Sequence, residues 1–415
     1  MSCPDLRPGT DRAPDIRLIA FTDAGRELAG RLAALLELPP EAAQRCGQPL
    51  DLRTWTARGF AEGADALVFV GAAGIAVRAV APCVASKASD PAVVAVDEAA
   101  RFAIPLLSGH LGGANELALR IAGLVGATPA LTTATDVRGV FAVDSWARSQ
   151  GCAVQNPERI KAVSGALLAG RTVRLWSAWP IAGAAPAGVE VVDDPTLADV
   201  VLALGEKPAV LPEKPAPSGA PANPEAAARP SEAPPFSPAS RPLCLVPRIV
   251  VLGIGCRRGT PAETLEHAIE AALAEAGVWE QALAKACTID LKADEPGLRE
   301  FCTAHGLALE VFSAEELARV PGEFSGSAFV RSVTGVDNVC ERAAVLGSGG
   351  ELLLPKRTRD GVTVALAAAP FAPTWERGGR PAVAWTTGGR TGGEPAAGTP
   401  TLAAGNKTKE PDHAL

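Results

Sequence analysis

Short apolar runs alternate with helical patterns along the first half of the chain. The apolar runs at 16–21, 66–70, 92–97, 102–107, 129–133 and 200–204 predict strands, and the run at 102–107 predicts a buried one. Between them, apolar spacing and chain breakers predict helices over 25–38 and 140–150, a helix that ends at Val80, and a helix that contains Leu117, Ile121 and Leu124. This alternation of strand and helix predicts a mostly parallel, doubly wound α/β sheet.

The second half repeats the pattern on a smaller scale. Apolar runs at 249–254, 285–289, 307–312, 351–354 and 362–366 predict strands, and helices are predicted over 296–304, 314–319 and 325–333. The helix after residue 254 carries start signals, with Thr260 as the N-cap, Pro261 as the first helical residue and Glu263 two positions later. Gly277 is predicted to end it.

A proline-rich segment separates the two halves. Twelve of the 36 prolines lie between Pro208 and Pro247, mixed with Ala, Ser and Glu, and this composition predicts an extended linker. The stretch after residue 370 is rich in Gly, Thr and Pro and predicts a disordered tail. We therefore expect an α/β region over 15–205, a linker over 206–247, a second α/β domain over 248–370 and a tail over 371–415.

Composition narrows the class of protein. The chain has 415 residues, 47% of them hydrophobic, and no apolar run long enough to cross a bilayer. Its start lacks an apolar segment, and its nine cysteines form no C-x-x-C pair, so we expect reduced thiols, a cytoplasmic location and no structural zinc. A net charge of −7, 4% aromatic residues and no tyrosine argue against nucleic acid as a partner.

The stretch Ser108–Glu116, with the sequence SGHLGGANE, is the strongest candidate for chemistry. It joins the predicted strand at 102–107 to a helix, and glycines at such a turn let the backbone approach a ligand. The start of a helix favours negative charge, and His110, Asn115 and Glu116 lie beside it. A tight connection with a histidine satisfied inside the loop is the alternative interpretation.

Other polar residues follow neighbouring predicted strands. Asp97 and Glu98 lie at the end of the run at 92–97, Lys87 lies in the loop Ser86–Asp90, and 132–136 is rich in threonine. We expect these loops to meet His110 at one edge of the sheet, where α/β proteins bind ligands, although each alone could be a solvated turn or a helix cap.

The second domain opens with a weaker signal. The stretch 253–260 begins as a Gly-x-Gly turn, but Arg258 replaces the third glycine of a dinucleotide fingerprint, so no nicotinamide site is expected. Arg257 and Arg258 beside a helix start suit a carboxylate or a phosphate instead. Cys256 is a weaker candidate for a nucleophile, since no histidine lies near it in the sequence.

These residues resemble one family, CbiG, the cobalt-precorrin-5A hydrolases of anaerobic cobalamin biosynthesis. The resemblance rests on several stretches in both halves, above all SGHLGGANELA at 108–118, and also GIAVRAVAP at 74–82, KASDPAVV at 87–94, TTATD at 132–136, the stretch 253–263, the stretch 288–298, FSAEEL at 312–317 and VTGVDNVCE at 333–341. The proline-rich linker and the glycine-rich tail depart from the family's pattern.

The resemblance implies a reaction. The family acts on a cobalt-bearing, ring-contracted tetrapyrrole, opens its δ-lactone and releases acetaldehyde, which gives cobalt-precorrin-5B. Cobalt arrives with the substrate, so no further cofactor and no metal site of the protein are expected. The implied partners are this substrate and neighbouring enzymes of the corrin pathway, with no membrane.

The same reaction suggests roles for the candidate residues. Lactone opening needs a base and donors for an oxyanion, so we expect His110 as the base, Glu116 or Asp97 to orient it, and the N–H groups of Gly112 and Gly113 to hold the oxyanion. The substrate carries many carboxylates, and the polar and cationic residues expected to bind it are Asn115, Arg78, Lys87, Arg257, Arg258 and Lys292.

Two other classes of function remain open from the sequence. One is a tetrapyrrole carrier or scaffold that releases no acetaldehyde. The other is an α/β regulator that binds sugar phosphates at the His110 loop and ignores corrinoids.

Overall fold

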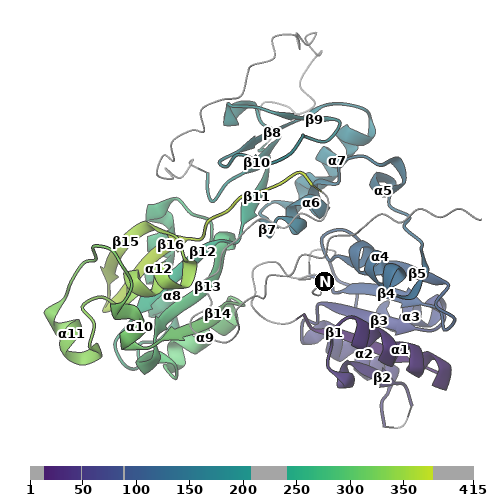
Figure 1. The fold of residues 1–415 in the computed structure, drawn as a ribbon, viewed down its shortest axis with the longest axis horizontal. Helices are drawn as coiled ribbons and strands as arrows, with labels where there is room; N and C mark the ends of the chain where they lie inside the picture. Colours follow the sequence, from purple (N-terminus) through teal and green to yellow (C-terminus); the bar gives the residue numbers. More distant parts are fainter. Residues whose placement is uncertain (1–13, 48, 87–88, 207–240, 377–415) are drawn as a thin grey trace, which may run out of the picture.

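The structure, a computed structural model, describes residues 14–47, 49–86, 89–206 and 241–376. These residues form three sheets, of six, five and five strands, and the α/β class expected from the sequence is confirmed (Figure 1). The predicted tail beyond residue 376 and most of the predicted linker, 207–240, lie outside the described residues.

The first sheet has helices on both faces. Its strand order is β2 (Ala43–Arg45), β1 (Ile16–Ala20), β3 (Ala66–Val70), β4 (Ala92–Val96), β5 (Phe102–Leu107) and β6 (Thr128–Pro129). Alternate residues of the central strands point to opposite faces. Val68 and Val94 pack with α1 (Asp23–Leu35) and α4 (Ala114–Val125), whereas Phe69 and Val93 pack with α2 (Leu52–Ala61) and α3 (Ala73–Val80).

Strand β5 runs against its neighbour, and this reversal decides where its loop lies. β4 and β5 are antiparallel, with Val96 opposite Ala103 and Val93 opposite Leu107, whereas the other pairs of this sheet are parallel. The loop after Leu107 therefore leaves the sheet at the edge where β4 begins. Of the six residues of β5 only Ala103 is buried, so the expectation of a buried strand is wrong.

The second sheet takes a strand from the predicted linker. Its order is β7 (Cys152–Val154), β11 (Leu243–Pro247), β10 (Val200–Leu202), β8 (Val173–Ser177) and β9 (Val189–Val191), with α5 (Ala134–Arg138), α6 (Val143–Ser149) and α7 (Ile160–Leu168) nearby in sequence. All five residues of β11 are buried, because their apolar side chains complete the sheet between β7 and β10. The predicted linker is therefore wrong at its last residues.

The third sheet is mixed. Its order is β14 (Ala308–Phe312), β13 (Leu283–Ile289), β12 (Val250–Gly255), β16 (Val362–Ala368) and β15 (Glu351–Arg359). Strand β16 is antiparallel to both of its neighbours, β12 and β15. The helices of this part are α8 (Ala262–Ala276), α9 (Pro296–Ala304), α10 (Ala314–Ala318), α11 (Ala328–Thr334) and α12 (Cys340–Ser348). One continuous core joins the second and third sheets, with Val163 and Leu245 in the same cluster as Leu265 and Leu366.

Two helices in this part differ from the prediction. Thr260 does not cap α8, because its hydroxyl donates to the carbonyl of Arg257 (2.8 Å) and Pro261 occupies the N-cap, although Gly277 ends the helix in the left-handed conformation as expected. Helix α12 was not predicted, since its residues CERAAVLGS carry small and charged side chains among few large apolar ones.

The left-handed residue that starts α4 provides a test of the fold. Gly113 has φ 85°, and a Cβ there would overlap the guanidinium of Arg148, so Gly113→Ala should lower the free energy of unfolding by roughly 2 kcal/mol or more. Gly123 lies inside the same helix with open space around it, and Gly123→Ala should instead raise stability by about 0.5–1 kcal/mol. Urea unfolding of both variants checks this, and equal effects would contradict the described loop.

Candidate functional site

The side chain of His110 lies between two carboxylates that come from later parts of the chain. Its Nε2 is 3.2 Å from Asp136 Oδ2, and its Nδ1 is 3.3 Å from Asp144 Oδ2. Asp136 lies on α5 and Asp144 on α6, so the site is made where the chain passes from the first sheet to the second. Both ring nitrogens therefore face negative charge.

Burial differs on the two sides of the ring. The side chains of His110 and Asp144 are 16% and 10% exposed, whereas that of Asp136 is 30% exposed. The Nδ1 side is thus the enclosed side, and the Nε2 side is the one that a ligand can approach.

These contacts keep the imidazole charged at neutral pH. The hydrogen bond to Asp144 and, more weakly, that to Asp136 raise the pKa of His110 to about 9, although burial acts in the opposite direction. Burial acts to raise the pKa of Asp136, but hydrogen bonds from Thr133 and His110 outweigh it and the pKa is lowered. An imidazolium with both N–H groups directed at carboxylates is a proton donor, so this geometry makes His110 an acid at neutral pH rather than the base expected from the sequence.

The loop that carries His110 is held by its own backbone. Ser108 adopts φ 56°, and its hydroxyl donates to the carbonyl of Asp90 (3.0 Å), which brings Asp90 beside it. The N–H groups of Gly113, Ala114 and Asn115 donate to the carbonyls of His110, Ser108 and Gly109.

These backbone hydrogen bonds change the role expected for the glycines. The Gly113 amide is already used, so it is not free to hold an oxyanion as expected. A Cβ on Gly112 would overlap Ser108, which shows that Gly112 allows the loop to close on itself.

Asn115 fixes the position of Asp136. Its amide nitrogen donates to Asp136 Oδ2 (2.8 Å) and to Thr133 Oγ1 (3.2 Å), and the Thr133 hydroxyl also donates to Asp136. Asn115 is 7% exposed. It therefore positions the carboxylate from within the protein, and this role replaces the expected direct contact with substrate.

Glu116 does not orient His110 as expected. Its carboxylate pairs with Arg148 of α6, whose side chain is 6% exposed and lies under Gly113. This ion pair joins the start of α4 to α6 and adds a second link beside the contact of His110 with Asp144.

Asp97 does not orient His110 either, because the reversal of β5 places it at the opposite edge of the sheet. Its carboxylate accepts the N–H groups of Ala99, Arg101 and Phe102 and closes the turn between β4 and β5. Burial acts against the charged form, but these backbone hydrogen bonds outweigh it and lower the pKa of Asp97. Asp97 is a turn residue in this structure.

The expected cationic residues are spread over the molecule. Arg78 is exposed on α3, and Arg257 and Arg258 are exposed after β12. Lys292 pairs with Glu295 (2.9 Å), which also accepts the Gly259 N–H. Lys87 lies outside the described residues.

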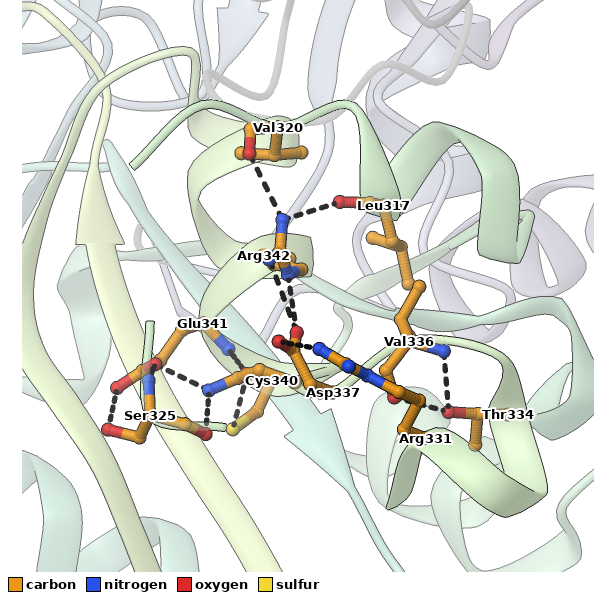
Figure 2. Close-up of polar contacts among 11 residues, drawn as sticks. Leu317, Val320, Ser325, Arg331, Thr334, Val336, Asp337, Cys340, Glu341 and Arg342 are labelled. Carbon is orange, nitrogen blue, oxygen red and sulfur yellow. Dashed lines mark hydrogen bonds and ion pairs between the residues drawn. The ribbon is translucent and has the colours of Figure 1, made fainter. Parts of the chain in front are cut away.

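Two further motifs serve the fold. Burial raises the pKa of the Cys256 thiol, which argues against a reactive thiolate there. In the stretch 333–341, Glu341 is 1% exposed and accepts the N–H groups of Ser325 (2.8 Å) and Lys356 (2.7 Å). Figure 2 shows the contacts between Glu341 and Ser325 beside the Asp337 carboxylate, which bridges Arg331 and Arg342.

The hollows found in the first part of the chain do not contain His110. A cavity of about 680 Å³ lies at the start of β1 and is lined in part by Asp15, Arg17, Trp55 and Arg58. None of the expected site residues lines it. In the described parts of the chain, no group of three or more His, Cys, Asp or Glu side chains is arranged to hold a metal ion. No helix there is both long and apolar enough to span a bilayer.

Three residues of this site were not predicted from the sequence. Asp136 was noted only as part of a threonine-rich loop, and Asp144 and Arg148 were placed in a helix without a role. Asp144 and Arg148 are four residues apart and therefore share one face of α6, a charged pair in a helix whose other residues include Val143, Trp146 and Ala147. This charged pair on one face of the helix was the sequence feature that could have identified Asp144 and Arg148.

Three family descriptions match the chain in succession. They are Cobalamin synthesis G N-terminal over residues 55–136, Cobalamin biosynthesis central region over 141–211 and Cobalamin synthesis G C-terminus over 250–367. The first match ends at Asp136 and the second begins just before Asp144, so the His110 cluster lies where the two regions meet.

Curated relatives match most of the chain. A cobalt-precorrin-5A hydrolase of Salmonella typhimurium is 35% identical over 87% of this chain and 99% of its own length, and one of Priestia megaterium is 29% identical over 88% and 97%. A solved structure of a cobalamin biosynthesis protein G homolog from Sulfolobus solfataricus covers 85% of this chain and 96% of its own, with 19% identity and a TM-score of 0.36. With these family regions in order and this identity along the whole of a relative, the chain belongs to the cobalamin synthesis G (CbiG) family.

Proposed function

We propose that this protein is a cobalt-precorrin-5A hydrolase. The observation that carries the proposal is the similarity to two curated cobalt-precorrin-5A hydrolases over almost their entire lengths. The structure adds a charged imidazole with a carboxylate on each side, which is an acid and a base in contact. Such a pair suits the opening of a cyclic ester.

The first step is lactone hydrolysis. Asp136 takes a proton from water, the water oxygen bonds to the lactone carbonyl carbon, and the ring C–O bond breaks. His110 gives its Nε2 proton to the leaving alkoxide.

The second step releases acetaldehyde. Asp136 returns its proton to His110 and then takes the proton of the freed hydroxyl group. The C–C bond to the macrocycle breaks as the aldehyde C=O forms, and the electron pair passes to the macrocycle, which takes up the proton that Asp136 removed, so that Asp136 ends as a carboxylate and His110 as an imidazolium. Asp144 stays on Nδ1 throughout and fixes the ring, as an orienting carboxylate does in other acid–base sites.

Recognition of a substrate with many carboxylates needs cationic side chains in an acidic protein. We assign this to the exposed Arg78, Arg257 and Arg258, which are available to the carboxylates of a tetrapyrrole, and to Lys292 to a smaller extent because Glu295 already pairs with it. Cobalt is carried by the substrate in this proposal, and no other cofactor is required. We further place the reaction in the cytoplasm, beside the enzymes that make and use these intermediates.

Substitutions at the cluster test the chemical roles through acetaldehyde release. His110→Gln and Asp136→Asn should each lower kcat by about 10²-fold or more, because each removes a proton donor or acceptor. Asp144→Asn should lower kcat less, since it changes the ring's orientation and charge rather than a reacting group.

Asp97→Asn is the matched control for these variants, since Asp97 lies at the far edge of the sheet, and it should retain its rate. Wild-type rates in His110→Gln would remove His110 from the reaction. Binding of the cobalt tetrapyrrole by the wild type with no acetaldehyde released would favour a carrier instead.

The charge on His110 predicts a pH dependence of stability. Because its pKa is raised from 6.5 to about 9 in the folded protein, the stabilisation is complete below pH 6.5 and is lost as the pH rises through 9. The difference in free energy of unfolding between wild type and His110→Gln should therefore be larger at pH 6 than at pH 10, by on the order of 3 kcal/mol. Urea unfolding at the two pH values measures this, and a constant difference would contradict the charged pair.

A further inference from the structure

The chain after β16 returns to the second sheet and reaches α6. Residues 371–376, which we call the strap, run from the third sheet toward α6 and α7 (Figure 1). The Ala182 N–H donates to Pro373 O (2.9 Å), and the Trp375 N–H donates to Ala182 O (2.9 Å). The strap is thus paired to the second sheet region as an added length of extended chain.

The strap contacts α6 at Trp146 and, just after the helix, at Gln150. The rings of Trp146 and Trp375 are stacked with centroids 4.7 Å apart, and Phe141 packs against both. The indole N–H of Trp146 donates to Thr374 O (2.9 Å). At the end of the helix, Gln150 Oε1 accepts the Thr374 N–H (2.9 Å).

The opposite side of α6 carries the residues that meet the first sheet's loop. Asp144 and Arg148 share one side of the helix, and Trp146 lies about 200° around the axis from Asp144. α6 has only seven residues and no side-chain cap, so its own hydrogen bonds cannot fix its position. Its placement depends on what packs against each side.

We propose that Trp375 is a positioning residue, which acts through Trp146 to set the place of Asp144 against His110. The effect of Trp375 on the reaction rate rests on the proposed function. Its effect on the geometry of the site does not depend on that function. The strap thereby links the third sheet, from which it emerges, to the chemistry at the junction of the first and second.

The groups that face His110 make its titration a readout of this geometry. They are Asp136 from α5 and Asp144 from α6, with the Glu116–Arg148 pair beside them on α4 and α6. If α6 shifts, the distance between Asp144 and His110 increases, and the pKa of His110 falls toward its ordinary value.

The test is Trp375→Ala in the full chain, with Trp375→Phe as the conservative variant that keeps a ring over Trp146. Trp176→Ala is the matched control, because that half-buried indole lies on β8 and donates to Asp193 O. NMR titration of the His110 ring and steady-state acetaldehyde release are measured for each. Trp375→Leu, which keeps apolar cover without a stacked ring, replaces the alanine variant if that one does not fold.

We expect Trp375→Ala to lower the pKa of His110 by about one unit or more and kcat about tenfold, with KM changed less than about twofold. Trp375→Phe should restore both, and Trp176→Ala should leave both unchanged. An unchanged His110 titration in Trp375→Ala would overturn the proposal. A shifted titration in that variant, together with a wild type that releases no acetaldehyde, would support the strap and overturn the proposed function.

Discussion

The imidazole of His110 is held in place by charge from two sides, and this contact joins the loop of the first sheet to helices α5 and α6. One carboxylate, on Asp144, is enclosed and belongs to the second sheet's region, and the other, on Asp136, is more exposed and follows the first sheet. The ring reaches both because β5 runs antiparallel to β4 and delivers the loop to the edge that faces α5 and α6. A parallel β5 would have carried His110 to the edge where Asp97 lies.

Support for this contact extends outward in steps. Backbone carbonyls of the loop cap α4, Asn115 and Thr133 hold Asp136, and Glu116 pairs with Arg148 on the helix that bears Asp144. That helix is short and is packed on its other side by Trp375. The third sheet supplies the strap, and its own loops are held by buried groups such as Glu341. Regions far apart in the sequence therefore converge on one histidine.

Much of the architecture could be predicted because local patterns determine it. The apolar runs that became β3, β4 and β12 are long, continuous and bounded by glycine or charge, so their identity as strands was clear from the sequence. The number of sheets was not predictable, because β11 lies in a proline-rich stretch and is apolar for only a few residues. The direction of β5 was hidden as well, since the turn at Asp97 that reverses the chain resembles any solvated turn.

The site was predicted in part for the same reason. His110, Asn115 and Glu116 belong to one contiguous motif and could be identified together, but their partners lie 20 to 40 positions away and are fixed only by packing. Parallel topology led to Asp97 as the orienting carboxylate, and the antiparallel β5 excludes it. The glycines were expected to bind an anion, whereas the loop's carbonyls already occupy the amide of Gly113.

The most direct test of the account is an NMR titration of the wild-type protein. The chain has four histidines, and comparison with His110→Gln identifies the signals of His110. This ring is expected to titrate with a pKa of about 9 and to stay charged at neutral pH. A pKa near 6.5, the ordinary value for histidine, would contradict the carboxylate–imidazolium–carboxylate arrangement and with it the acid assigned to the reaction.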